Sequence, residues 1–344
     1  MAFLITLLRR LVTLFEKYPG LMAALAFGSG VASYVLVEGR ETFAQMIAAL
    51  MLASWLLLVL EKWLRAEFLK RFKRDMPPTI MRFGTQMVHQ ESLFFALPFF
   101  LAATSWNSVQ AVFTSLLILC ALISVIDPLY YRQLAPRRSL YVLFHSLTLF
   151  AVLMVALPLI FQLNTRQSLQ LALLVAFVFS LPSLGNVFAN GGRWRLPIIA
   201  ALLLVMAGGL WLMRSWVPPA VLELRGISLS QQLNREQRSP GPPLDQIGAA
   251  ALLEKGLYAW TSVRAPRGLR DQIHHVWIHN GEVVDRITLD IEGGNDGGYR
   301  AWTHKLSFPT DPSGRWQVRV VTDSGQLIGI TRFVVLDSTT APLR

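Results

Sequence analysis

The stretch "QIHHVWIHNGEVVDRITLDIEG", residues 272–293, decides how the C-terminal third of the chain folds. Apolar and polar residues alternate on both sides of Asn280-Gly281, and Asn-Gly between two alternating runs is the strongest short signal for a β-hairpin. Counting outward from this turn gives three predicted cross-strand pairs, namely His279–Glu282, Trp277–Val284 and His275–Arg286.

The two faces of the predicted hairpin carry different side chains. Branched aliphatic residues such as Val276 and Ile278 share one face, which we expect to form the core, because successive side chains on a strand point to opposite faces. His275, Trp277 and His279 point the other way. Residues four apart on a strand are separated by about 13 Å, so His275 and His279 cannot hold one metal ion. We therefore predict no metal site and no cofactor.

An exposed row of aromatic, histidine and arginine side chains is typical of a surface that binds sugar, peptide or protein, although a packed or solvated structural face remains an alternative. Two further tryptophans, Trp260 and Trp316, are expected in the core. The candidate binding residues are His275, Trp277, His279, Arg300, Trp302 and His304.

Short alternating segments run from Val221 to Leu336, and they predict several antiparallel strands in an immunoglobulin-like β-sandwich over residues 215–338. The segment "IGAAALLEKG", residues 247–256, predicts a short helix that ends at Gly256. Residues 339–344 are expected to form a tail.

The succession "LYAWTSV", "HHVWIHNGEVV", "YRAWTHKL", "GRWQVRVVTDSGQLIG" and "RFVV" resembles a C-terminal domain of unknown function that recurs on bacterial multi-pass inner-membrane proteins. The resemblance covers residues 222–336. It implies an architecture and a location, but no catalytic residue.

The first 214 residues form a series of long apolar runs. The whole chain is 53% apolar and only 15% charged, whereas a soluble domain has about 25% charged residues. A helix that crosses a bilayer needs about 20 mostly apolar residues. We predict seven transmembrane helices within residues 18–214, at Gly20–Val37, Phe43–Leu60, Met87–Thr104, Val109–Ile126, Leu140–Phe161, Leu169–Phe188 and Leu196–Met213. Residues 1–17 predict an amphipathic helix at the membrane interface.

The charge distribution gives the predicted orientation. Residues 1–214 hold 18 Lys+Arg and 8 Asp+Glu, and the remainder holds 14 and 13, so the basic character belongs to the apolar half rather than to a nucleic-acid-binding domain. With a cytoplasmic N-terminus, the loops expected inside carry 15 Lys+Arg and those expected outside carry Arg40, Arg166 and Arg214. Cytoplasmic loops are enriched in positive charge. We therefore expect the C-terminal domain in the periplasm of a bacterial cell.

The most basic loop, Lys62–Arg74, predicts a helical extension that lies on anionic lipid of the inner leaflet. Ionisable residues inside predicted spans are few, and each has a structural reading beside the functional one. The intramembrane polar candidates are His89, Glu91, Asp127, His145 and Asn186.

These observations favour a non-enzymatic inner-membrane protein whose periplasmic domain binds an envelope protein or glycan. One alternative is a transporter or membrane-embedded enzyme that handles lipid or cell-wall precursors, which requires the intramembrane polar residues to converge. Another is an envelope sensor that relays a signal to a cytoplasmic partner.

Overall fold

Residues 41–72, 78–188, 208–209, 211–295 and 297–337 are described by a computed structural model of the chain. The chain divides into a first unit, residues 1–101, 114–160 and 169–210, and a second unit, residues 102–113, 161–168 and 211–344. The predicted interfacial helix at 1–17, the predicted span Gly20–Val37 and the tail at 339–344 lie outside the described residues. Most of the predicted span Leu196–Met213 also lies outside them.

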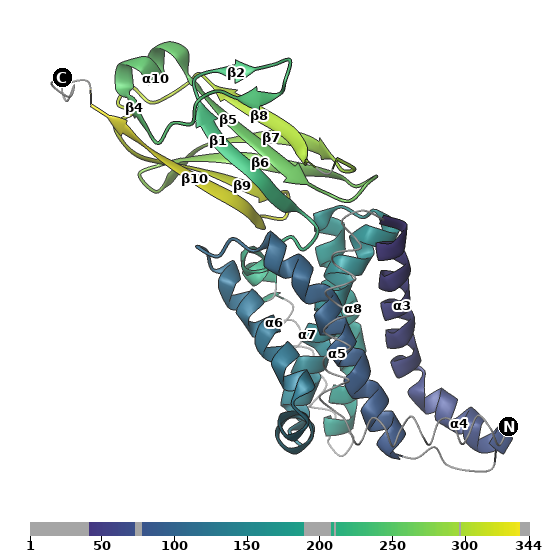
Figure 1. The fold of residues 1–344 in the computed structure, drawn as a ribbon. Coiled ribbons are helices and arrows are strands. Elements are labelled where there is room, and N and C mark those ends of the chain that lie inside the picture. Colours follow the sequence, from purple (N-terminus) through teal and green to yellow (C-terminus); the bar gives the residue numbers. More distant parts are fainter. Residues whose placement is uncertain (1–40, 73–77, 189–207, 210, 296, 338–344) are drawn as a thin grey trace. The chain divides into compact units, whose positions relative to one another are not determined.

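The first unit is helical (Figure 1). Its core is built from large apolar side chains such as Leu93, Phe100 and Leu117, which are almost completely buried. The helices that form or enter this unit are α3 (Glu41–Val59), α4 (Glu61–Phe72), α5 (Pro78–Ala103), α6 (Gln110–Val125), the π-helix η1 (Pro128–Leu134), α7 (Arg138–Phe161) and α8 (Thr165–Phe188).

The predicted count of seven transmembrane helices is wrong. In the described part of the chain, one helix, Leu140–Phe161, is long and apolar enough to cross a membrane, and a second qualifies only if α6 and η1 form one bent span. The chain bends by 101° between these two helices, next to Pro128, which cannot donate a backbone hydrogen bond.

The other predicted spans that fall within the described residues fail for two reasons. The apolar parts of α3 and α8 cover only Gln45–Leu58 and Thr165–Val178, which is shorter than a bilayer requires. Helix α5 is long, but the polar run "HQES" at residues 89–92 interrupts its apolar sequence. The predicted fold class of a seven-helix bundle followed by an immunoglobulin-like sandwich is thereby corrected to a helical unit followed by a β-rich C-terminal region.

The β-rich character of that C-terminal region is confirmed. One sheet has the strand order β1-β5-β8, a second has the order β4-β10-β9-β6-β7, and β2 pairs only with β3. Every pairing is antiparallel except that of β4 with β10. The strands are β1 (Glu223–Ser230), β2 (Leu233–Asn234), β3 (Ser239–Pro240), β4 (Gln246–Gly248), β5 (Leu257–Arg264), β6 (Arg270–His279), β7 (Glu282–Glu292), β8 (Tyr299–Lys305), β9 (Gly314–Thr322) and β10 (Leu327–Leu336).

The two larger sheets lie against each other (Figure 1). One core lies between them and contains Trp277, Trp316 and Phe333 together with residues of the three-stranded sheet such as Leu257. A short helix, α10 (Ala249–Lys255), packs at its edge and ends at Gly256 as the sequence predicts. A short 3-10 helix, η2 (Met213–Trp216), precedes the first strand.

The hairpin turn at Asn280-Gly281 is confirmed. Both residues have positive φ, 49° and 96°, which is the backbone conformation that an Asn-Gly turn adopts. The pair His279–Glu282 also forms as predicted. Beyond it the register shifts by one residue between Trp277 and Ile278, so that Trp277 lies opposite Asp285 rather than Val284.

Candidate functional site

The predicted binding row on β6 is buried, which corrects its assignment to the surface. His275 and Trp277 have no exposed area, because the side of β6 that carries them faces the three-stranded sheet. Val276 and Ile278, on the opposite side, are also almost completely buried. Strand β6 lies between β7 and β9 and is covered on both sides, so the alternation in its sequence does not separate core from solvent.

His275 is a hydrogen-bonded core residue. Its Nδ1 lies 3.0 Å from Thr303 Oγ1, and its Nε2 lies 3.2 Å from Thr261 Oγ1. The hydroxyl of Thr261 donates to the carbonyl of Ala301, so it can accept a hydrogen bond from His275 Nε2 while Thr303 donates to Nδ1. This pattern suits a neutral imidazole, and burial lowers the pKa of His275 to about 4.

His279 lies at the rim of the core rather than on a binding surface. Its ring stacks on Trp316, with ring centres 4.4 Å apart and planes inclined by 16°. Its Nε2 lies 2.8 Å from the carbonyl oxygen of Ser313. Trp316 is almost completely buried, as predicted. Both histidines of the predicted row therefore stabilise the fold.

The other three predicted binding residues, Arg300, Trp302 and His304, do form a row, and it lies on the outward side of β8. The inward positions of this strand, such as Thr303, are buried, whereas Arg300 and His304 are exposed and Trp302 is partly exposed. In the register with β5, Trp302 lies opposite Trp260. Trp260 is partly exposed on the same surface, so its expected place in the core is wrong.

Trp260 is held in one orientation across the sheet. Its Nε1 donates to the carbonyl of Arg238 at 2.9 Å. Its six-membered ring lies over β1 at Gly226, where an added Cβ would come within 3.0 Å of Cζ3. The absence of a side chain at Gly226 thus lets the indole lie close to the strand, with one edge fixed by a hydrogen bond.

Neighbouring side chains complete this surface. His304 stacks on Tyr258, with ring centres 3.9 Å apart and planes inclined by 7°, and its Nε2 lies 3.1 Å from the carbonyl oxygen of Lys255. Arg300 donates to the carbonyl of Gln237 at 2.9 Å. We call this surface the outer aromatic face, and it consists of Tyr258, Trp260, Arg300, Trp302 and His304.

The sequence contains a signal for the outer aromatic face that the initial interpretation missed. The tripeptide Ala-Trp-Thr occurs twice, at residues 259–261 and 301–303. The two copies pair antiparallel around the two tryptophans. The small residues on either side of each tryptophan point inward, where they leave room for Trp277 in the core.

The helical unit holds a second group of polar side chains. His89 is completely buried, and its Nε2 lies 2.8 Å from His145 Nδ1. Its Nδ1 lies 2.8 Å from the hydroxyl of Tyr130, a residue that the sequence did not single out. The ring of His145 lies 4.8 Å from that of Trp55. Two of the intramembrane candidates, His89 and His145, therefore come together.

The remaining intramembrane candidates do not join this pair. Asp127 accepts a hydrogen bond from Gln86 Nε2 at 2.8 Å, one helical turn away from His89 on α5. Glu91 has no hydrogen bond or ion pair with the described residues. Asn186 belongs to α8, and its side chain lies outside the described residues. Of the four residues whose convergence the transporter or enzyme alternative requires, His89, Glu91, Asp127 and His145, only His89 and His145 come together.

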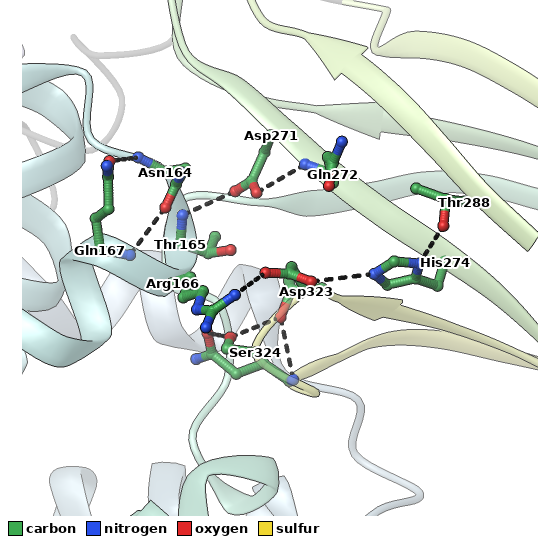
Figure 2. Close-up of polar contacts among 12 residues, drawn as sticks. Asn164, Thr165, Arg166, Gln167, Asp271, Gln272, His274, Thr288, Asp323 and Ser324 are labelled. Carbon is green, nitrogen blue, oxygen red and sulfur yellow. Dashed lines mark hydrogen bonds and ion pairs between the residues drawn. The ribbon is translucent and has the colours of Figure 1, made fainter. Parts of the chain in front are cut away.

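A third polar cluster surrounds Asp323 in the turn between β9 and β10 (Figure 2). Its Oδ2 accepts a hydrogen bond from Arg166 Nη1 at 2.9 Å, and its Oδ1 lies 3.5 Å from His274 Nε2. The hydrogen bond from Arg166 holds the pKa of Asp323 below its usual range. Burial, together with the positive charge of Arg286, lowers the pKa of His274, although Asp323 acts in the opposite direction.

Several distant segments of the second unit are tied to the turn at residues 322–327. Arg214 Nε donates to the carbonyl of Ser324 at 2.8 Å, and Gln110 Nε2 donates to that of Leu327 at 2.9 Å. Nearby, Asp271 accepts a hydrogen bond from the backbone N–H of Thr165 at 2.8 Å (Figure 2). Burial raises the pKa of Asp271, although this N–H acts against the shift. The segments 102–113 and 161–168 are thereby fixed to the β-strands.

The last two predictions concern the lipid-binding segment and metal ions. Part of the predicted lipid-binding segment Lys62–Arg74 forms α4, whose last turn carries Lys70 and Arg71, while residues 73–77 lie outside the described part of the chain. Among the described residues, no group of three or more His, Cys, Asp or Glu side chains is arranged to hold a metal ion.

Comparison with protein families gives two matches. The family model described as Family of unknown function (DUF5924) matches residues 1–259, and the one described as Protein of unknown function (DUF2914) matches residues 270–335. A search of curated proteins found no match. The predicted resemblance to an uncharacterised family with a C-terminal domain of unknown function is confirmed. The first match ends within β5 and the second begins at the first residue of β6, so the two matches divide one folded unit.

Proposed function

We propose a function from the geometry of the chain itself, because the chain belongs to DUF5924, a family of unknown function. In this proposal the helical unit anchors the protein in the bacterial inner membrane, with the N-terminus in the cytoplasm. The β-strands of the second unit lie in the periplasm, where the outer aromatic face binds an envelope glycan.

Exposed apolar side chains on the helices support the membrane anchor. A folded protein in water rarely exposes many large apolar residues along several helices, whereas lipid accepts them. Helix α7 also has the length and composition of a span. The large exposed apolar residues on α3, α6, α7 and α8 are Met46, Leu50, Leu56, Leu57, Val112, Leu116, Leu119, Leu122, Leu140, Leu143, Phe161, Leu174 and Val178.

The division of the chain supports the proposed orientation. The loop that joins α5 to α6 and the loop that joins α7 to α8 both belong to the second unit, together with the β-strands. Arg166 and Arg214, which the charge distribution assigns to the outside, lie in this unit. Loops that fold with the β-strands must share their side of a membrane, which agrees with a periplasmic second unit.

One observation carries the binding proposal, namely the cross-strand pair of Trp260 and Trp302 on an outward surface. Flat aromatic rings stack against the C–H faces of sugar rings, and nearby polar groups bond the hydroxyls. The outer aromatic face has this composition, since Arg300 and His304 flank the indoles. Among the described residues of β1, β5 and β8, no large aliphatic side chain is strongly exposed, so the surface is aromatic and polar rather than aliphatic.

The binding proposal is tested by titrating soluble peptidoglycan glycan strands into the full chain in lipid nanodiscs, with tryptophan fluorescence as the readout. We expect saturable binding that Trp302→Ala weakens about tenfold or more, because a central aromatic contact contributes roughly 2 kcal/mol. Val283→Ala is the matched control, since Val283 is exposed on β7, in the other large sheet. Equal affinity of Trp302→Ala and the unchanged protein would refute the assignment of the site.

The anchoring and orientation need a separate test. Protease added to spheroplasts should cleave the second unit, and the helical unit should stay with the membrane after carbonate extraction. Release of the intact chain by carbonate would contradict the anchor, and full protection of the β-strands would contradict the orientation.

One observation favours a second function in the helical unit, that of a transporter or membrane-embedded enzyme for lipid or cell-wall precursors. The contacts between Tyr130, His89 and His145 form a continuous line of three groups that can pass a proton. His89→Phe should abolish any proton-coupled uptake measured in proteoliposomes, and Phe144→Leu, which changes an adjacent buried ring, is the control. An uptake that survives His89→Phe would exclude this role.

A further inference from the structure

The second unit contains a small pocket beside the turn that joins β9 to β10. Its volume is about 180 Å³. Four separate parts of the sequence contribute to it, namely the first turn of α8, η2 and the residues just before it, strand β7, and the turn itself. The pocket is lined by Arg166, Trp211, Arg214, Arg286, Asp323, Ser324 and Gly325.

The lining has a surplus of positive charge. It holds three arginines and a single carboxylate, that of Asp323, which pairs with Arg166. The guanidinium of Arg286 makes no hydrogen bond or ion pair with the described residues, so its charge is not neutralised by them. An uncompensated group of guanidinium ions attracts an anion, and the planar donor fork of arginine fits the oxygens of a phosphate group.

Arg214 is fixed before any ligand arrives. Its Nε donates to the carbonyl of Ser324 at 2.8 Å, its Nη1 donates to the carbonyl of Trp211 at 3.0 Å, and its guanidinium lies over the Trp211 ring at 5.1 Å. A side chain that is already held loses little conformational freedom on binding. The pocket is therefore partly organised for an anion.

The positive charge is confined to this pocket, because a neighbouring pocket has a negatively charged lining. The neighbouring pocket has a volume of about 400 Å³ and shares Arg166 and Asp323 with the basic pocket. Its lining holds two arginines and four carboxylates, so its charge has the opposite sign. The charged residues of this acidic pocket are Arg166, Arg270, Asp271, Asp290, Glu292 and Asp323.

Exposed apolar residues next to the basic pocket indicate where the anion comes from. Trp211 and Trp216 are more than one-third exposed, and Leu212, between them, is 76% exposed. The same unit adds Trp106, in the loop between α5 and α6, and Phe161, the last residue of α7, which are also exposed. Tryptophan is enriched where proteins meet the headgroup layer of a membrane. A phosphate group at the level of these side chains belongs to a lipid.

We propose that the basic pocket binds the phosphate of an anionic phospholipid headgroup, while Trp211, Leu212 and Trp216 insert between the lipids around it. The proposal rests on the proposed membrane anchor, and it adds a specific lipid site on the periplasmic side. The site would fix the second unit at the membrane surface independently of any glycan.

The test counts lipids bound to the full chain. Protein purified in a neutral detergent is mixed with phosphatidylglycerol or phosphatidylcholine, and native mass spectrometry gives the affinity for each. We expect phosphatidylglycerol to bind more tightly, and Arg286→Gln to weaken it about tenfold. Arg286→Glu should weaken it further. Arg332→Gln, which removes the same charge from an exposed position on β10 outside both pockets, should leave binding unchanged.

Three results would overturn the proposal. Equal affinity of Arg286→Glu and the unchanged protein would exclude the pocket, and an equal loss with Arg332→Gln would show a general charge effect. Displacement of phosphatidylglycerol by an equal concentration of inorganic phosphate would show that a free anion is the ligand. Glycan binding does not involve the pocket, and lipid binding in detergent does not require anchorage, so failure here is distinguishable from failure of the proposed function.

Discussion

Two short segments of the second unit have almost the same sequence and opposite environments. "WIH" at residues 277–279 in β6 and "WTH" at residues 302–304 in β8 both place a tryptophan and a histidine on one side of a strand. Trp277 is completely buried, whereas Trp302 is partly exposed and His304 is exposed. The pattern along a strand thus shows which side chains share a side, but not which side faces the core.

The residues between the tryptophans explain the difference. In β8 the inward positions are occupied by Ala301 and Thr303, and in β5 by Ala259 and Thr261, so the three-stranded sheet presents a shallow inner surface. The indole of Trp277, from the opposite sheet, fills the resulting space. The tryptophans between these small residues, Trp260 and Trp302, point outward. The space available between the two sheets therefore decides which side of each strand faces the core. The alternation of apolar and polar residues within one strand does not decide it.

The largest difference in stability is expected between alanine variants of the two tryptophans. Trp277→Ala should lower the free energy of unfolding of the second unit by about 3–5 kcal/mol, because it leaves a large cavity in the core. Trp302→Ala should lower it by less than about 1 kcal/mol, because the side chain lies at the surface. Pulse proteolysis of the full chain in urea measures both changes, and similar losses in the two variants would contradict the assigned orientations.

The buried His275 should make the stability of the second unit depend on pH. Burial lowers the pKa of His275 to about 4, below its ordinary value of 6.5. The unfolded chain therefore binds the proton first, and stability falls as the pH decreases from about 6.5 to about 4. The total loss is about 3 kcal/mol.

His275→Gln provides the control for this pH dependence, because glutamine can still donate and accept hydrogen bonds but does not titrate. Unfolding measured at several pH values should show a smaller loss in this variant than in the unchanged protein. An equal loss of stability on acidification in His275→Gln and in the unchanged protein would contradict the account.

The smallest effect is expected at the polar cluster around Asp323. Arg166→Gln removes an ion pair in which both side chains are substantially exposed, and such pairs contribute about 0–1 kcal/mol. Thermal unfolding should therefore change little. A loss as large as that of Trp277→Ala would show that the cluster, and not the core between the sheets, holds the second unit together.

Parts of this structure were predictable from local sequence. The turn at Asn280-Gly281 and the end of α10 at Gly256 follow from backbone conformations that these residues favour, and they formed as expected. The candidate site was half predictable, because Arg300, Trp302 and His304 lie together on the outer aromatic face.

The remainder depends on contacts between distant residues. The pairing of His89 with His145 joins two helices, and the register shift at Trp277 depends on the opposing strand. The number of transmembrane helices was wrong because apolar composition does not reveal where a helix stops or bends, as it does before Pro128.

The central claim is that the outer aromatic face binds a glycan while the similar row on β6 is structural. Fluorine NMR of the full chain labelled with 5-fluorotryptophan tests it directly, with each resonance assigned by substitution to phenylalanine. Addition of peptidoglycan glycan strands should shift the resonances of Trp260 and Trp302 and leave those of Trp277 and Trp316 in place. Shifts confined to the two buried tryptophans, or no shift at any of the four, would contradict the claim.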